Sequence, residues 1–195
     1  MTTARARAYA LQHIIIRERG YSDRATDRGG KTKDGITERV ARGKPWFYKG
    51  DMRELPDELR DRIYLTDYWH SLNLDAVAAV MPVLAVEICD AGVNCGVSSV
   101  GPWLQRSLNA LNTYNKKAGK FLYGMDLKVD GKIGPATIRR LEQVKSHRGA
   151  DGQRVLVAMV ETLQGNRYMN LADDVTQRDY TYGWFVNRIL DEVPA

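Results

Sequence analysis

The fold of this chain is decided by three short motifs near its N-terminus, which read Glu18-Arg19-Gly20-Tyr21, Asp27-Arg28-Gly29-Gly30-Lys31-Thr32 and Gly35-Ile36-Thr37. Glycines are interspersed with polar residues through this segment, and no apolar face runs along it. Polar segments rich in glycine form turns, so we predict tight turns and a small hairpin over residues 21–37.

A helix is predicted immediately before these motifs, over residues 4–19. Thr2 or Thr3 can cap its start, and Gly20 can end it. The residues that recur every three or four positions, and therefore share one helical face, are Ala4, Ala8, Leu11, Ile15 and Glu18.

Glu18 is thus a carboxylate at the end of an apolar stripe. Loss of hydration on such a face favours the protonated carboxyl, the form that a general acid needs to protonate a leaving glycosidic oxygen. The alternative is a helix-end glutamate that forms a surface ion pair with Arg17, Arg19 or another cation.

Asp27 lies nine residues after Glu18 and supplies a second carboxylate. Two carboxylates facing each other across a cleft are the usual arrangement of a glycosidase. Asp27 would hold or activate water, or stabilise the positive sugar ring, and Thr32 would orient that water through its hydroxyl. The alternative for Asp27 is a turn residue that binds its own backbone.

The three motifs closely resemble the signature of the family 108 glycoside hydrolases, which is roughly E-G-G-Y, then D-P-G-G-x-T, then G-I-T. The resemblance implies an N-acetylmuramidase of lysozyme-like fold, of the kind that many phages and prophages encode. It also implies that Glu18, which matches the catalytic glutamate of the first element, is the catalytic residue. The order of Glu, Asp and Thr, and the spacing from Glu to Asp, are similar to those of the lysozymes of T-even phages.

The chain departs from the family pattern at Arg19 and Arg28. Arg19 adds a cation beside the supposed acid, which would favour the ionised carboxylate if the two side chains met. Adjacent residues on a helix point in different directions, so we expect Arg19 to face the cleft rim or solvent.

A second resemblance lies in the C-terminal half, where residues 127–137 are similar to the V-D-G-x-x-G-x-x-T element of peptidoglycan-binding domains. Residues 103–109 resemble the helix that precedes this element. The resemblance implies a helical peptidoglycan-binding region and makes Asp130 a candidate for contact with substrate. The alternative is that Asp130 and Gly131 form a structural turn.

Several other residues are candidates for contact with substrate. The aromatic residues Tyr21, Tyr68 and Trp69 could stack on sugars or line a cleft, although aromatic residues at helical spacing are more often core. Asn94 could meet substrate or cap a helix. Thr37, in the last of the three motifs, is assigned to substrate binding through the resemblance.

The remainder of the chain is predicted to be helical in most places. We expect irregular structure over residues 38–53, a helix from Pro56 and a buried helix over about 75–92 that Pro82 breaks or kinks. A further helix starts at Ser98 or Ser99 and reaches Leu111, and a polar loop covers 113–126. Later helices are expected from Pro135 to about 145, over about 152–172 and over 176–191, with a surface loop at 146–152.

Glu87 and Asp90 lie on the most apolar helix, where buried ion pairs are the default explanation.

The composition is that of a soluble globular protein. The 195 residues are 44% hydrophobic and 27% charged, and the net charge is +5. A basic surface suits an anionic cell envelope, while the lack of a dense Lys/Arg block argues against nucleic acid. The longest apolar run, residues 76–86, is too short to span a membrane, and no secretory signal is found.

Metal and disulfide chemistry are not expected. His13, His70 and His147 have no ligand spacing, and Cys89 and Cys95 form no zinc motif with them. We interpret the two cysteines as reduced, packed thiols, which fits synthesis in a bacterial cytoplasm.

The sequence therefore predicts a mainly α, lysozyme-like fold with a small β or turn-rich wing after the first helix. Residues 1–97 would form a catalytic lobe, and residues 98–195 a helical peptidoglycan-binding lobe packed against it. The predicted function is that of a monomeric, cofactor-free phage endolysin that hydrolyses the β-1,4 bond between N-acetylmuramic acid and N-acetylglucosamine. It would be made without a signal peptide and act at the cell wall. Two alternatives stay open, which are a lytic transglycosylase and a peptidoglycan-binding protein without catalysis.

Overall fold

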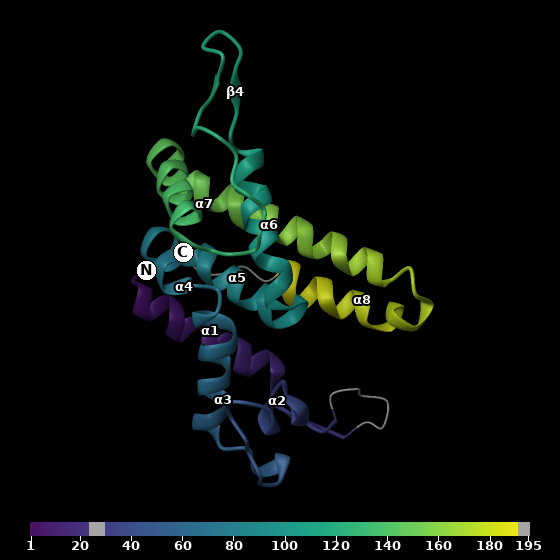
Figure 1. The fold of residues 1–195 in the computed structure, drawn as a ribbon. Helices are drawn as coiled ribbons and strands as arrows, with labels where there is room; N and C mark the ends of the chain where they lie inside the picture. Colours follow the sequence, from purple (N-terminus) through teal and green to yellow (C-terminus); the bar gives the residue numbers. More distant parts are fainter. Residues whose placement is uncertain (24–29, 191–195) are drawn as a thin grey trace.

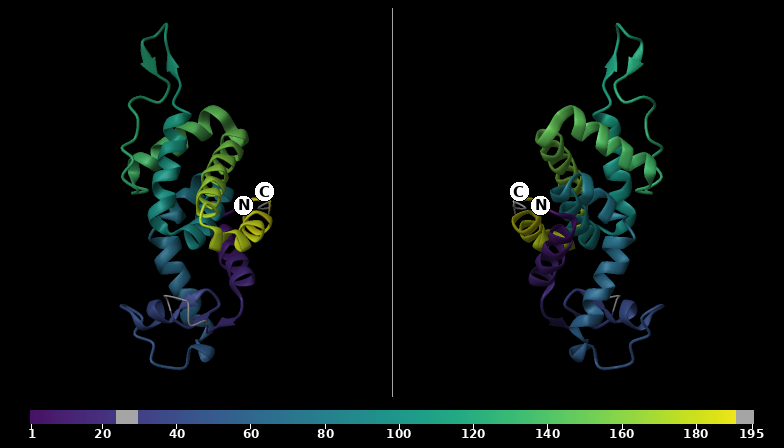
Figure 2. Two further views of the ribbon diagram at one scale, coloured as in Figure 1. Left: turned by 90° about the vertical axis from the view of Figure 1, so that its right-hand side faces the viewer. Right: turned by 90° about the vertical axis from the view of Figure 1, so that its left-hand side faces the viewer.

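The computed structural model describes residues 1–23 and 30–190, and shows a helical body with a projection at each end (Figures 1 and 2). One projection is the wing after the first helix, and the other is a hairpin from the C-terminal half. The elements of the first half are α1 (Thr3–Glu18), β1 (Tyr21–Ser22), β2 (Thr32–Lys33), β3 (Ile36–Thr37), α2 (Glu38–Arg42), η1 (Met52–Glu54), α3 (Asp57–Tyr64), η2 (Leu65–His70), α4 (Leu74–Val80) and α5 (Pro82–Cys95). Those of the second half are α6 (Val97–Ala110), β4 (Tyr114–Asn115), β5 (Lys120–Phe121), α7 (Pro135–Leu171), η3 (Val175–Gln177), α8 (Arg178–Trp184) and η4 (Phe185–Ile189).

Helix α5 is the centre of the body and packs against α1, α4, α6 and α7. Its residues are apolar on nearly every side, which is the pattern of a helix surrounded by others. The predicted break at Pro82 is confirmed, because α4 ends at Val80 and Pro82 occupies the first turn of α5. Cys89 and Cys95 are both free and buried, as predicted.

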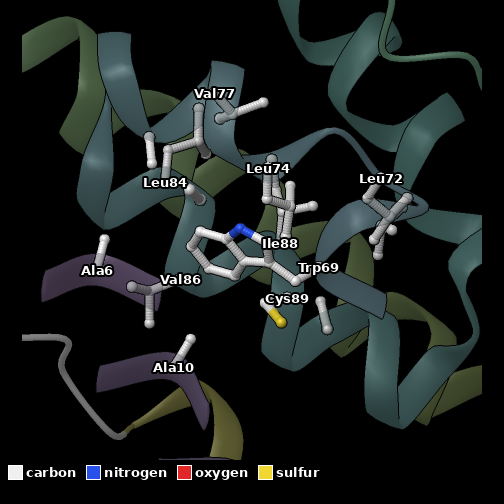
Figure 3. Packing of buried hydrophobic residues seen from close by; sticks show 14 of the residues in the cluster. Ala6, Ala10, Trp69, Leu72, Leu74, Val77, Leu84, Val86, Ile88 and Cys89 are labelled. Atoms are coloured by element: carbon white, nitrogen blue, oxygen red, sulfur yellow. The ribbon is translucent and has the colours of Figure 1, made fainter. Parts of the chain in front are cut away.

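Helix α1 has the predicted extent, and the Thr2 side chain accepts a hydrogen bond from the Arg5 amide at its start. The predicted buried face is wrong, because Ala4 and Ala8 are exposed. The buried stripe is Ala6, Ala10 and Ile14. Small side chains let α1 lie close to α5, and Figure 3 shows Ala6 and Ala10 beside Val86. The next position on this stripe, four residues after Ile14, is Glu18, so the carboxylate still ends a buried stripe.

The wing contains a three-stranded antiparallel sheet in the order β1-β2-β3, in which Thr32 is paired with Thr37. The expectation of irregular structure over residues 38–53 is wrong in part. A short helix, α2, forms there because the Thr37 side chain caps it by accepting a hydrogen bond from the Val40 amide at 3.4 Å.

The C-terminal half also departs from the prediction in two places. The polar loop at 113–126 includes the hairpin β4–β5, whose Tyr114 and Phe121 rings are in edge contact. The loop expected at 146–152 is helical except at Gly149, where φ is 58° and α7 bends. One glycine with positive φ is enough to redirect a helix without a loop.

The chain is mainly α with a lysozyme-like fold and a small β wing after the first helix, as predicted. Within the described residues, no helix is both long and apolar enough to cross a membrane. Residues of α8 and η4 line one cleft with the last turn of α1, so a late segment of the sequence lies beside the C-terminal end of the first helix.

Candidate active site

Glu18 lies at the last position of α1, on the wall of a cleft of about 650 Å³ between α1 and the helices α8 and η4. Its side chain is 26% exposed, so the carboxylate is partly removed from water and still open to a ligand. The residues that line the cleft are Ile16, Arg17, Glu18, Asn94, Asp179, Tyr180, Gly183, Trp184, Asn187 and Arg188. Arg19 is exposed, which agrees with the expectation that it points away from the acid.

Arg188 holds Glu18 in place from the other end of the chain. Its Nη2 donates to Glu18 Oε1, and its Nη1 donates to Asp90 Oδ1. Arg17 also donates to Asp90 Oδ1, at 2.7 Å. The side chains of Arg188 and Asp90 are each 8% exposed, so the ion pairs are buried and poorly screened by salt. The expectation that Asp90 forms buried ion pairs is confirmed.

Glu87 lies one turn before Asp90 and differs from it in its contacts. Its Oε1 is buried and has no hydrogen-bond partner among the described residues. Burial raises the pKa of Glu87 to about 8, and the negative charges of Asp90 and Glu161 add to the effect. Glu87 is therefore protonated at neutral pH, which corrects the expectation that it forms an ion pair.

The turn at Asp34 and Gly35 locks the wing to the end of α1. Asp34 Oδ1 accepts from the Gly20 amide at 2.8 Å, and the Asp34 carbonyl accepts from the Tyr64 hydroxyl at 2.7 Å. Burial alone would raise the pKa of Asp34, but the Gly20 hydrogen bond and the charge of Lys33 hold it below the usual value. Gly35 has a φ of 77°, and a Cβ there would lie 2.9 Å from Glu18 Cβ. Only glycine lets the turn approach the aliphatic part of the Glu18 side chain this closely.

The candidates on the wing have structural contacts. Thr32 donates to the Gly30 carbonyl at 3.4 Å, and Thr37 caps α2. Tyr21 donates to Asp23 at 3.3 Å, and its ring lies under the Arg53 guanidinium. None of the three lines the cleft that contains Glu18. Asp27, the proposed second carboxylate, lies outside the described residues.

The three candidates on the helices lie in different environments. Asn94 lines the cleft with Glu18 and accepts from the Tyr168 hydroxyl at 2.6 Å. Tyr68 is half-buried, and its pKa is raised by burial and by the charges of Asp67 and Glu18. Trp69 is a core residue, 1% exposed, whose indole donates to Asp75 (Figure 3). It cannot stack on a sugar without leaving the core, which corrects that assignment.

Asp130 belongs to a turn that Gln105 holds against α6. The Gln105 side chain donates to Asp130 Oδ1 at 2.9 Å and accepts from the Gly131 amide at 2.8 Å. Asp130 Oδ1 also accepts a hydrogen bond from the Lys132 amide. The hydrogen bond from Gln105, and then the one from Lys132, lower the pKa of Asp130. The turn packs so closely on α6 that a Cβ at Gly101 would lie 2.2 Å from the Gly131 carbonyl oxygen. Asp130 does not line the cleft that contains Glu18.

Sequence reasoning missed two cleft aromatics and one ion-pair partner. Tyr180, Trp184 and Arg188 all lie in the C-terminal segment, where the sequence suggested only a closing helix. No nearby residue indicates that Arg188 forms ion pairs, because its partners Glu18 and Asp90 lie far away along the chain. The Asp34-Gly35 pair is a turn signal that could have been found.

The arrangement holds a carboxyl group in a fixed orientation beside the space that a ligand would occupy. A partly exposed carboxylate lies on a cleft wall, a buried guanidinium orients it, and aromatic and amide side chains line the same cleft. In the described part of the chain, no group of His, Cys, Asp and Glu side chains could hold a metal ion.

Two family models match the chain, one over each half. Residues 11–96, which include the second half of α1, the wing and α5, match the family model described as glycosyl hydrolase 108. Residues 101–189 match a second model, described as a predicted peptidoglycan domain. The chain joins a glycosyl hydrolase 108 domain to a peptidoglycan domain. Both resemblances predicted from the motifs are confirmed.

These two domains make the chain a protein that degrades or binds peptidoglycan, and therefore one that acts on the cell wall. The structure of Brucella abortus SagA is similar to that of this chain, with a TM-score of 0.61 and 19% sequence identity. The similarity covers 92% of this chain and 87% of that one, and it shows a shared fold. No curated protein matches the chain. Arg188 lies in the peptidoglycan domain and Glu18 in the glycosyl hydrolase 108 domain, so the ion pair joins the two.

Proposed function

We propose that the chain is an N-acetylmuramidase that hydrolyses the β-1,4 bond between N-acetylmuramic acid and N-acetylglucosamine. The observation that carries the proposal is the position of Glu18. It ends the buried stripe of α1, lies partly exposed on a cleft wall and is held by Arg188. The match of residues 11–96 to glycosyl hydrolase 108 supports a glycosidase in particular.

In this proposal Glu18 protonates the leaving glycosidic oxygen and is left as a carboxylate. Arg188 contacts Oε1, so the proton would be donated from Oε2. The same contact fixes the orientation of the carboxyl group toward the bound glycan.

Asp27 would hold or activate the water, or stabilise the positive sugar ring, and Thr32 would orient the water through its hydroxyl. Thr32 lies on β2, next to the Asp34 turn that is tied to the end of α1. We assign the catalytic lobe to residues 1–97 and the peptidoglycan-binding lobe to residues 98–195, with Arg188 as a contribution of the second lobe to the first.

The biological setting that we propose is that of a monomeric phage endolysin, which a separate membrane-permeabilising protein releases to the wall. The net charge of +5 would attract it to an anionic envelope. Activity on purified wall should then fall as salt is raised from low to high concentration. Activity that does not change with salt concentration would contradict the proposed electrostatic attraction to the envelope.

The experiment that tests the proposal is mass spectrometry of the fragments released from purified peptidoglycan. It compares the wild type with Glu18→Gln, and with Glu58→Gln as a control at an exposed glutamate of α3. We expect reducing N-acetylmuramic acid ends from the wild type and the control, and at least about a hundredfold fewer from Glu18→Gln.

Two other results would change the assignment. Anhydro ends would identify a lytic transglycosylase. The absence of fragments, with binding to the wall intact, would identify a peptidoglycan-binding protein without catalysis.

A further inference from the structure

We propose that Tyr180 and Trp184 form an aromatic platform that binds a sugar of the glycan next to Glu18, so that the peptidoglycan domain supplies a subsite of the catalytic cleft. This inference rests on the proposed function for the identity of the ligand. It concerns residues of α8, which no motif of the sequence singled out.

Three aromatic rings lie nearly parallel and extend from the core to the cleft. Tyr168 on α7 is buried, and its ring stacks with Trp184 at 5.2 Å between centroids and 23° between planes. Trp184 is half-buried and stacks with Tyr180 at 6.0 Å and 25°. Tyr180 is 49% exposed. A large exposed aromatic ring supported by two others is stabilised in one orientation before any ligand arrives.

The support beneath the platform is rigid. The Tyr168 hydroxyl donates to Asn94 and accepts from Gln164 at 2.7 Å, and Gln164 is fully buried. The Phe185 ring packs on the edge of Tyr168. These contacts join α8 to α5 and α7, so the platform is attached to the body of the protein and does not depend on a loop.

The platform and Glu18 face the same space. Tyr180, Trp184 and Glu18 all line the cleft of about 650 Å³. This volume lies within the range of about 300–1,000 Å³ that is typical of sites for small ligands. A ligand on the aromatic rings would therefore lie beside the carboxylate.

The chemistry of the lining fits an N-acetylated sugar. One face of a pyranose ring consists of C–H groups, which pack on an aromatic face as other apolar groups do. Asn94 and Asn187 also line the cleft and carry amide groups that can pair with the amide of an N-acetyl group. Aromatic faces with a few polar groups are the usual composition of a site that binds such a ligand.

Helix α8 offers a matched control for this proposal. Tyr182 lies two residues after Tyr180, is 81% exposed, and does not line the cleft. The Tyr182→Ala variant removes a tyrosine side chain from the same helix and leaves the proposed subsite unchanged. Tyr180→Phe keeps the ring and removes only the hydroxyl.

The test is calorimetric titration of a peptidoglycan-derived tetrasaccharide into the full-length Glu18→Gln protein, in which hydrolysis is suppressed. We expect Tyr180→Ala to weaken binding about five- to tenfold, while Tyr180→Phe and Tyr182→Ala bind as the parent does. Trp184→Ala should weaken binding at least as much, and Tyr180→Ala keeps the test valid if that variant does not fold. In the catalytic background, the Tyr180→Ala change should raise KM and leave kcat nearly unchanged.

Binding that is equal in Tyr180→Ala and Tyr182→Ala would overturn the platform, as would the lack of any binding to the parent protein at millimolar ligand. Because the measurement does not depend on catalysis, it is separate from the fate of the proposed function. If the wild type releases no fragments but Tyr180→Ala binds more weakly than Tyr182→Ala, the subsite stands and the muramidase does not.

Discussion

Glu18 and Arg188 form an ion pair although 170 residues separate them in the sequence. The Arg188 side chain is 8% exposed and also binds Asp90 of the central helix, so it connects the end of α1, the middle of α5 and η4. Arg188 is a positioning residue in this arrangement, since it acts on the proposed acid and not on the substrate.

Replacement of Arg188 by alanine should lower kcat about 10- to 100-fold with little change in KM, because Glu18 loses the contact that orients it. Arg188→Lys should recover part of kcat, since it restores the charge without the two-pronged geometry. The measurement is steady-state hydrolysis of soluble peptidoglycan, with melting temperatures to establish folding.

The control for Arg188 is Arg154→Ala, which removes an arginine that is 82% exposed. It should leave kcat unchanged. A folded Arg188→Ala protein with wild-type or higher kcat would contradict the positioning role.

Replacement of Gly35 by alanine should destabilise the protein and reduce its activity. The new Cβ would lie 2.3 Å from the Tyr64 hydroxyl oxygen and 2.9 Å from Glu18 Cβ, in addition to the strain of a φ of 77°. Gly119→Ala is the matched control, because Gly119 has a φ of 63° and no atom within 4 Å of an added Cβ.

In denaturant unfolding, Gly35→Ala should lose about 1–3 kcal/mol more than Gly119→Ala, which is the usual cost of overpacking. Equal losses in the two variants would mean that only the backbone conformation matters at Gly35. The close approach of the turn to Glu18 would then have no energetic consequence.

The pKa of Glu87, about 8 in the folded protein against 4.5 for the ordinary side chain, predicts a dependence of stability on pH. Between these values the folded state keeps a proton that the unfolded state releases. The free energy of unfolding should therefore fall as pH rises from 4.5 to 8, by about 1.4 kcal/mol per pH unit from this group.

Glu87→Gln removes this ionisation, so its unfolding free energy should fall less steeply over the same range. Glu142→Gln, at an exposed position of α7, should keep the wild-type slope. The measurement is denaturant unfolding at several pH values, and a slope that is the same in Glu87→Gln and the wild type would refute the assignment.

Much of the fold could be predicted because the signals are local. Thr2 starts α1, Pro82 separates α4 from α5, and Pro135 starts α7, each through contacts within a few residues. The face of α1 was predicted wrongly because hydrophobicity favoured Leu11 and Ile15. The close packing of α1 on α5 instead buries the small residues Ala6 and Ala10.

The candidate site could be predicted only in part. Glu18 is a candidate because it ends an apolar stripe and because residues 18–21 resemble the first element of the family signature; both signals are local. Trp69 was assigned to the site because an aromatic side chain has the same pattern whether it stacks on a ligand or fills the core. The structure places it in the core.

The sequence by itself determined where the long helices start, the glycine-rich turn after the first helix and the family that each half resembles. These properties depend on backbone conformation and on residues close together in the chain. Only the tertiary structure decided that Arg188 binds Glu18 and that Tyr180 faces the same cleft. The packing of α1 and α7 on α5, and of η4 on α7, sets those contacts, and no short-range pattern records which distant side chains such packing brings together.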